Sequence, residues 1–351
     1  MVKTKKLSSS ILTVFKVSFT IVGTIIGAGF ASGKEVSTFL GVYGNIAYLA
    51  CFLFGLAFCL GTIYFSSMDK TILSPFLKTA LNICIFFSEF TSIIAMLAGL
   101  QSIFDMIFTN NIPYYISLVL IFLIIILGFN GLTSTNLILV PILVVSLIIF
   151  GIIGIKTAPT FSLVTTKCVP IFFTTSLPLY IGMNLFNVYP IAVEFSSYQT
   201  KKESIFSCII ASTLLTTLLF CFCFTILNIS SSCVNCELPL IIYILDTAPQ
   251  FITLSIITLA VAIITTIISD GFVVHSLIKK KVKKHDNIAL LIIFIIAFLI
   301  SRLGFSNIVE NFYPIIGLIG TMFTLILIGR GIYLKQKFRK KQKPSTSSIK
   351  I

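Results

Sequence analysis

The stretch that decides the fold is Gly23-Thr24-Ile25-Ile26-Gly27-Ala28-Gly29-Phe30, inside the first hydrophobic run of the chain. Its three glycines weaken an α-helix, because glycine loses more backbone entropy than alanine when it is ordered. In hydrocarbon, unwound backbone is tolerated only where it lines a cavity or is buried in protein. A broken first helix is one way in which secondary transporters build a solute site near the middle of the membrane. Glycines also allow two membrane helices to pack closely, so this stretch alone leaves both interpretations open.

The composition is that of an integral membrane protein. Of the 351 residues, 57% are hydrophobic and only 10% are charged, and the mean hydropathy is +1.09. Soluble domains carry about 25% charged residues, so the composition excludes an ordinary soluble protein. We expect no cleavable signal peptide, because the first run continues into Lys34-Glu35 without a small-residue cleavage site.

Hydrophobic runs long enough to cross a bilayer, which takes about 20 residues, predict ten membrane helices. Their ranges are 11–40 (interrupted), 45–67, 75–108, 113–129, 136–156, 170–197 (interrupted), 204–228, 252–278, 287–304 and 309–334. The third range exceeds what a bilayer requires, so we expect that helix to tilt or to project beyond the membrane. The segment 335–351 is basic and rich in serine, and we expect it to form a disordered cytoplasmic tail.

The net charge of +14 reflects membrane topology and does not point to a nucleic-acid partner. All but four of the 25 Lys and Arg residues lie on the side that holds both termini; the four are Lys34, Lys156, Lys167 and Arg302. Since positively charged segments stay in the cytoplasm, we expect both termini to be cytoplasmic. The lysine-rich loop 279–284 is also suited to anionic lipid.

The second interruption lies in span six, which contains Pro178, Gly182, Asn184, Asn187 and Pro190. Proline removes a backbone hydrogen bond and clashes with the preceding turn, although a simple kink would explain it as well. The interrupted spans are the first and the sixth of ten, which are corresponding positions in two halves of five. This pattern is typical of an inverted repeat with a central binding site. We therefore predict an all-α membrane protein with repeats at about 11–156 and 170–334, in which helices 1 and 6 are broken.

The nine cysteines give little indication of chemistry. Most lie inside predicted helices, where cysteine behaves as a small hydrophobic residue. Cys233 and Cys236 form a single CxxC in a loop, which is a weak zinc or redox signal, so a local disulfide or free loop thiols are favoured over a functional site. The sequence has no nucleophile–base arrangement, phosphate loop or metal-ligand cluster, so we do not expect an enzyme or a cofactor other than a sodium ion.

Three motifs resemble the YkvI-type bacterial membrane proteins: GTIIGAGFASGKE, YIGMNLFNVYP and GFSNIVENFYPIIGLIG. These proteins belong to the amino acid–polyamine–organocation superfamily, whose members have the leucine-transporter fold of five plus five inverted helices. The resemblance extends from about residue 12 to about residue 333. It implies a bacterial cytoplasmic membrane location and alternating access, in which spans 1, 2, 6 and 7 rock against a scaffold.

The resemblance also implies a solute site at the two interruptions. The free N–H groups of Gly27, Ala28 and Gly29 would hold a carboxylate, as expected of a half-helix N-terminus. Asn184 and Asn187 would offer amide groups to the rest of the solute. Alternatively, these asparagines satisfy the backbone that Pro190 frees.

Span eight contains Ala262-Ile263-Ile264-Thr265-Thr266, which resembles a sodium-site motif. The Ala262 carbonyl and the Thr265 and Thr266 hydroxyls would bind the ion together with the carbonyls of Gly23 and Ile26. An all-oxygen donor set suits a hard cation. Threonine often bonds back to its own helix carbonyl instead. Span five carries no mid-membrane lysine that would replace the sodium ion.

Charged residues inside the membrane are costly and usually face a cavity or a partner. Glu89, near the middle of span three, is a candidate for a proton carrier, for a ligand of a substrate amine, or for a structural hydrogen-bond partner. Lys16 and Asp270 are a candidate gate pair on the cytoplasmic side.

These features together predict a secondary transporter of an amino acid or a similar amine-bearing solute, with sodium favoured over proton coupling. The alternative is a membrane solute sensor of the same fold, such as a germinant-receptor subunit, which binds a solute without moving it. The expected partners are the solute and the lipid bilayer, no nucleic acid is expected, and the oligomeric state is left open.

Overall fold

The computed structural model describes residues 11–40, 46–68, 73–157, 175–227, 238–282 and 284–342. In this part of the chain all regular structure is helical. The α-helices are α1 (Ile11–Ile25), α2 (Ala28–Ala31), α3 (Lys34–Phe39), α4 (Ile46–Ser67), α5 (Pro75–Ile107), α6 (Ile112–Ile126), α7 (Phe129–Thr157), α9 (Leu177–Phe195), α10 (Lys201–Leu227), α11 (Pro239–Thr247), α12 (Ile252–Lys281), α13 (Asp286–Ile300) and α14 (Phe305–Gln342). Cys233 and Cys236 lie outside the described residues.

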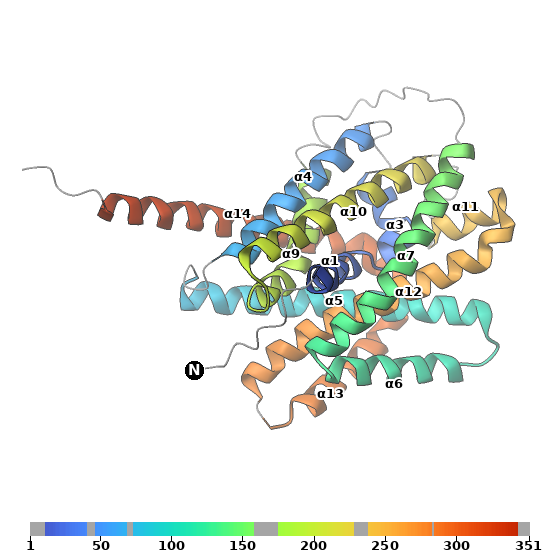
Figure 1. The fold of residues 1–351 in the computed structure, drawn as a ribbon. Coiled ribbons are helices and arrows are strands. Elements are labelled where there is room, and N and C mark those ends of the chain that lie inside the picture. The colour runs from blue at the N-terminus through green and yellow to red at the C-terminus, as the bar shows by residue number, and fades with distance from the viewer. Residues whose placement is uncertain are drawn as a thin grey trace, which may run out of the picture.

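The helices agree with the predicted spans. Seven of them are long and apolar enough to cross a membrane by length and composition, and two shorter apolar helices, α1 and α6, match the first and fourth predicted spans. The long third span is the 33-residue α5, which Ser74 caps by accepting a hydrogen bond from the Leu77 N–H. The sequence did not predict α11, a nine-residue helix before α12. The expectation of disorder from residue 335 is wrong as far as Gln342, because α14 stays helical to that residue and projects beyond the other helices (Figure 1).

The first span is interrupted as predicted. Helix α1 ends at Ile25 and α2 begins at Ala28, with Ile26 and Gly27 between them in non-helical conformation. Gly33, between α2 and α3, has a φ of 82°, which is a conformation that favours glycine. The break is buried, and α1 lies near the centre of the bundle in the view of Figure 1.

The sixth span differs from the prediction, because α9 runs without interruption from Leu177 to Phe195. Pro178 falls within the first two helical positions, where its missing N–H costs nothing. Gly182 serves packing, since a Cβ there would overlap the Thr321 side chain of α14. The Thr321 hydroxyl also donates to the Pro178 carbonyl oxygen at 2.9 Å. In this span glycine therefore allows two helices to pack closely and does not break the helix.

Helices at corresponding positions of the two predicted halves lie against each other. The pairs α1 with α9, α4 with α10 and α5 with α12 are all in contact. Helices α6 and α13 meet through aromatic pairs, Tyr115 with Phe298 and Phe122 with Phe294. Within each half the first helix also packs on the fifth, α1 on α7 and α9 on α14. These pairings place α1, α5, α9 and α12 around a common centre.

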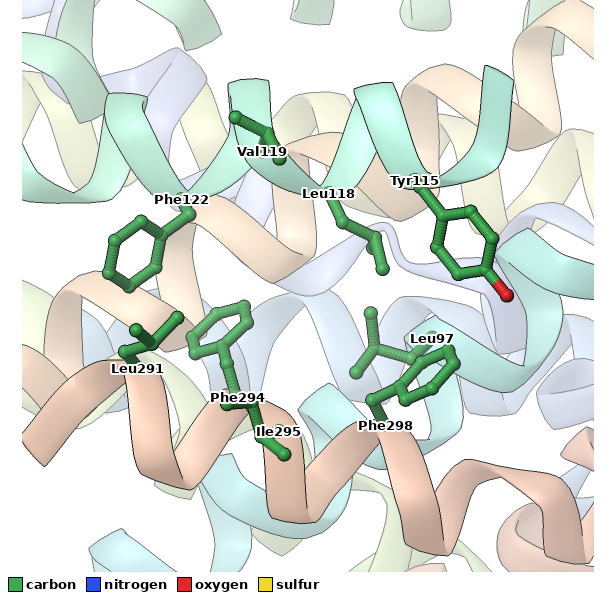
Figure 2. Close-up of a pocket in the computed structure, with 9 residues that line it drawn as sticks. All are labelled: Leu97, Tyr115, Leu118, Val119, Phe122, Leu291, Phe294, Ile295 and Phe298. Atoms are coloured by element: carbon green, nitrogen blue, oxygen red, sulfur yellow. The ribbon is translucent and has the colours of Figure 1, made fainter. Parts of the chain in front are cut away.

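An apolar cavity of about 230 Å³ lies between α6 and α13. Figure 2 shows its lining, in which Leu97 of α5 joins side chains of α6 and α13 and the Tyr115 hydroxyl is the one polar side-chain group drawn. Solute sites combine apolar walls with several placed polar groups, so we place the functional site at the break of the first span instead.

Candidate functional site at the break of the first span

Gly27, Ala28 and Gly29, three of the six residues predicted to hold a solute, lie at the break. Gly27 is extended, with φ −95° and ψ −167°, and a Cβ there would lie 3.1 Å from Met96 Cε of α5. The Ala28 N–H points at Met96 Sδ, 3.2 Å away, which is a weak acceptor. Because the first N–H groups of a helix have no partner inside it, Ala28 and Gly29 both offer donors at this point. Gly27, Ala28 and Gly29 therefore lie together in a buried position against α5.

The same break frees a carbonyl that faces α12. In a continuous helix the Gly27 N–H would bond to the Gly23 carbonyl, but here it bonds to Ile25 O at 3.0 Å. The Thr266 hydroxyl approaches the Gly23 and Ile26 carbonyl oxygens at 3.2 and 3.3 Å. Three of the five predicted cation ligands thus converge between α1 and α12.

The other two predicted ligands are neighbours on α12. The Thr265 hydroxyl lies 2.9 Å from the Ala262 carbonyl and 3.1 Å from the Val261 carbonyl, so it bonds back to its own helix. Ala262 and Thr265 are fully buried, and Thr266 is 3% exposed. Carbonyl and hydroxyl oxygens alone suit a hard cation such as Na⁺, and the carbonyl freed at Gly23 shows that the donor set fits one. If a cation is bound, these five residues would hold it.

Asn136 of α7 borders this group and was not predicted. It is fully buried, and neither its amide oxygen nor its amide nitrogen has a hydrogen-bond partner in the described part of the chain. A Cβ built on Gly23 would lie 3.0 Å from Asn136 Oδ1. A buried unpaired amide is costly, which makes Asn136 a candidate for further contact with whatever occupies the break. In the sequence, Asn136 stands as an isolated asparagine at the start of an apolar span. It was not selected because only a lysine was considered as a cationic group in this span.

Neither of the two predicted asparagines of α9 bonds to the backbone carbonyl that Pro190 leaves without a donor. Proline 190 frees the carbonyl four residues earlier, that of Phe186. Asn184 instead donates from Nδ2 to the Tyr180 carbonyl at 2.8 Å, and Asn187 Oδ1 accepts from the Ser88 hydroxyl of α5 at 3.1 Å. Asn187 therefore joins α9 to α5, next to Glu89.

Glu89 does not lie at the break. It precedes Met96 by seven residues on α5, which is about 10 Å along a helix. It is 1% exposed and faces Asp270 of α12. The predicted gate pair of Lys16 with Asp270 is not formed, since the ion pairs between described residues are Lys34 with Glu310 and His275 with Asp286. Asp270 is turned toward Glu89 instead.

On the side of the break opposite Glu89, charged and polar groups cover α2. The sequence analysis did not select these groups. Lys34 Nζ, 3% exposed on its side chain, pairs with Glu310 Oε1 of α14 at 2.7 Å. The Glu35 carboxyl packs on Gly29, and a Cβ there would overlap it. The Leu240 N–H of α11 donates to the Ser32 carbonyl at 2.9 Å. The signal in the sequence was the charged pair that directly follows the glycine-rich stretch.

Comparisons with known proteins identify the fold to which this arrangement of helices belongs. No family model matches the sequence. A protein of Bacillus subtilis (strain 168), "Uncharacterized protein YyaD", is 24% identical over 335 residues, which cover 90% of this chain and 96% of that protein.

Three solved transporters are similar in structure. The nucleobase-cation-symport-1 family transporter MHP1, closed with bromovinylhydantoin bound, has a TM-score of 0.55 at 13% identity over 86% of this chain and 74% of its own. A Na⁺-coupled sialic acid symporter has a TM-score of 0.51 at 12% identity, with coverage of 91% and 78%. The Eremococcus coleocola manganese transporter has a TM-score of 0.51 at 12% identity, with coverage of 96% and 89%. The chain is thus an all-helical membrane protein with the leucine-transporter fold.

Proposed function

We propose that this protein is a sodium-coupled secondary transporter of an amino acid or a similar small amine-bearing solute. Residues 11–156 and 170–334 would be the two inverted repeats, supported by the contacts between corresponding helices. Alternating access would take place by movement of α1, α4, α9 and α10 against the remaining helices. The likeness to a nucleobase-cation-symport-1 family transporter, a Na⁺-coupled symporter and a manganese transporter, together with the YkvI-type motifs, supports the class. The solute is argued from the site.

The observation that carries the proposal is the meeting of the Gly23 and Ile26 carbonyls with the Thr266 hydroxyl. This contact joins α1, which ends at the break, to α12, which is continuous. A cation held there by both helices would favour one arrangement of α1 relative to α12, and its release would remove that preference. Coupling requires such a difference in affinity between two states.

The solute is inferred from the groups at the break. The N–H donors of Ala28 and Gly29 suit a carboxylate. Beside Gly29, the buried Glu35 carboxyl suits an amine, and so does the Tyr180 hydroxyl of α9, which has no hydrogen-bond partner among the described residues. A compound that carries both groups close together, as an α-amino acid does, would satisfy the two sides at once.

Two sides of the membrane are distinguished by charge. The Lys34–Glu310 pair closes the lysine-poor side. On the lysine-rich side a cavity of about 320 Å³ is lined by α5, α9 and α12, with Lys78 and Lys280 at its wall. We infer that the cavity opens to the cytoplasm, where both termini would lie in a bacterial cell, because positively charged segments stay inside.

The test is uptake by purified protein reconstituted in lipid vesicles. Single radiolabelled amino acids are offered under an inward Na⁺ gradient and under an equal choline gradient. We expect at least one amino acid to accumulate only with Na⁺. The double variant T265A/T266A should weaken this dependence. Thr258→Ala is the matched control, since Thr258 is equally buried on α12 but its hydroxyl bonds to Leu254 O of its own helix.

Two results would contradict the proposal in different ways. Uptake that is equal in Na⁺ and choline for the unmodified protein would rule out sodium coupling. Stabilisation of the protein by an amino acid without any flux would make it a solute sensor of the same fold.

A further inference from the structure

Two buried carboxyl groups face each other between α5 and α12, away from the break. Glu89 and Asp270 are each 1% exposed. Their carboxyl groups lie close enough for each to act on the charge of the other. Both Glu89 oxygens and Asp270 Oδ2 lack a hydrogen-bond donor in the described part of the chain. Because both groups are acceptors when ionised, they can bond to each other only if one of them carries a proton.

The surroundings of this pair supply oxygen atoms and no cationic side chain. The Ser92 hydroxyl of α5 lies near Asp270, and the Tyr313 hydroxyl of α14 lies near Ser92. From α9, Asn187 reaches Ser88, the neighbour of Glu89. Among the described residues, no Lys, Arg or His forms an ion pair with either carboxylate.

Such a pair cannot hold two negative charges in a buried position. Two carboxylates in contact repel each other, and burial adds a desolvation cost of several kcal/mol for each unpaired charge. One positive charge placed between them removes the repulsion and supplies the missing partner. A proton or a Na⁺ ion can provide it, since four carboxyl oxygens and a hydroxyl form a hard donor set.

The pair also lies next to a route from the lysine-rich side. The cavity of about 320 Å³ is lined by the three helices that surround the pair, and its walls include Ile85 and Val273. Ile85 lies one helical turn before Glu89 on α5, and Val273 lies three residues after Asp270 on α12. The cavity therefore ends within about one turn of both carboxyl groups.

We propose that Glu89 and Asp270 form a second cation site, which holds one H⁺ or one Na⁺ between the two carboxyl groups and exchanges it through the α5–α9–α12 cavity. The site shares α12 with the oxygen group at Gly23, Ile26 and Thr266, but it differs from that group in its other helix, its ligands and its access. It rests on the proposed transport function only for its role in coupling, because cation binding by this pair does not require transport.

The test is infrared difference spectroscopy and thermal unfolding of the purified protein in detergent, titrated with NaCl at fixed pH and with pH at fixed salt. If the site holds a proton, the unmodified protein shows the signal of a buried protonated carboxyl that disappears at high pH. If it holds Na⁺, the melting temperature rises with NaCl and not with choline chloride. Either response should be lost, or its midpoint moved about tenfold or more, in Glu89→Gln and in Asp270→Asn.

Two controls separate this result from others. Glu194→Gln removes a carboxylate that lines the same cavity and should leave the response unchanged. T265A/T266A removes the two hydroxyl ligands of the other proposed cation site, so a Na⁺ response that is unchanged in this variant belongs to the carboxyl pair.

The inference is overturned if the unmodified protein shows neither response, a result that needs no variant to fold. It is also overturned if both responses survive in Glu89→Gln and Asp270→Asn. Binding without any amino-acid uptake in vesicles would refute the proposed transport function and leave the cation site standing.

Discussion

The first and sixth spans carry similar signals in the sequence, and the structure treats them differently. Both contain glycines in an apolar run, and the sixth adds two prolines. Yet the chain unwinds at Gly27 and stays helical through Gly182. At Gly27 the Met96 and Thr266 side chains lie where a Cβ would point, and the Gly27 N–H has an alternative acceptor in Ile25 O. At Gly182 the neighbours are the side chain and the backbone of Thr321 in α14.

A glycine therefore breaks a helix only where other groups compensate for the lost hydrogen bonds. Around Gly27, Thr266 approaches the freed carbonyls and Met96 lies against the next N–H. Around Gly182, the closest atoms belong to Thr321, and the gain is close packing of two helices.

Gly27→Leu should abolish solute binding and leave membrane insertion intact. A leucine side chain would fill the space taken by Met96 Cε and Thr266 Oγ1, at 3.1 and 3.2 Å from the Cβ position. The measurement is equilibrium binding of the transported amino acid, with a loss of more than tenfold expected. Gly329→Leu is the control, because nothing lies within 4 Å of a Cβ at that position. Wild-type affinity in Gly27→Leu would show that the break is not the solute site.

Gly182→Leu should lower stability without a specific effect on the cation. The Cβ would meet the Thr321 backbone nitrogen at 2.6 Å, so α9 and α14 must move apart. Overpacking of this kind costs about 1–3 kcal/mol. The melting temperature should fall, while the Na⁺ concentration for half-maximal uptake by the surviving protein stays the same. A changed Na⁺ dependence at unchanged melting temperature would place Gly182 in the site and remove the distinction between the two spans.

Thr266→Ala should weaken apparent Na⁺ affinity more than Thr265→Ala. Thr266 contacts both carbonyls freed by the break, whereas Thr265 bonds to its own helix. We expect about a tenfold loss for Thr266→Ala and a smaller one for Thr265→Ala, as read from Na⁺-dependent uptake. Equal losses of Na⁺ affinity in the two variants would mean that the Thr265 hydroxyl leaves its bond within the helix and binds the ion.

The sequence was sufficient for the helices and for the interruption of the first span, because both depend on local signals. Apolar runs of a set length and a cluster of three glycines indicate a span and its interruption without knowledge of the neighbours. The contacts of Asn136, Glu35 and Asp270 depend on which helix lies opposite. Asp270 was assigned to Lys16 from position along the chain alone, whereas its neighbour in space is Glu89, on a helix far away in the sequence.

The interruption of span six was predicted wrongly for a related reason. Proline and glycine mark places where a helix can break, but the outcome depends on whether α14 packs closely enough to hold the backbone. Gly317 and Gly320 of α14 lie against the α9 backbone at Leu179 and Gly182. These small residues sit in the last predicted span, where no pattern within span six could reveal them.

The smallest effect is expected for Pro190→Ala, which tests whether α9 needs its proline. Pro190 lies inside an uninterrupted helix, and it cannot donate to the Phe186 carbonyl one turn earlier. Alanine would supply that hydrogen bond, so if α9 stays helical throughout the transport cycle the melting temperature should hold or rise slightly. Uptake should then remain within about twofold of the unmodified protein, because the added hydrogen bond is present in every state and favours none of them. If α9 opens at Pro190 in another state of the cycle, the added bond would have to be broken each time. Turnover would then fall well beyond twofold while solute binding is unchanged, and the first and sixth spans would be alike in function after all.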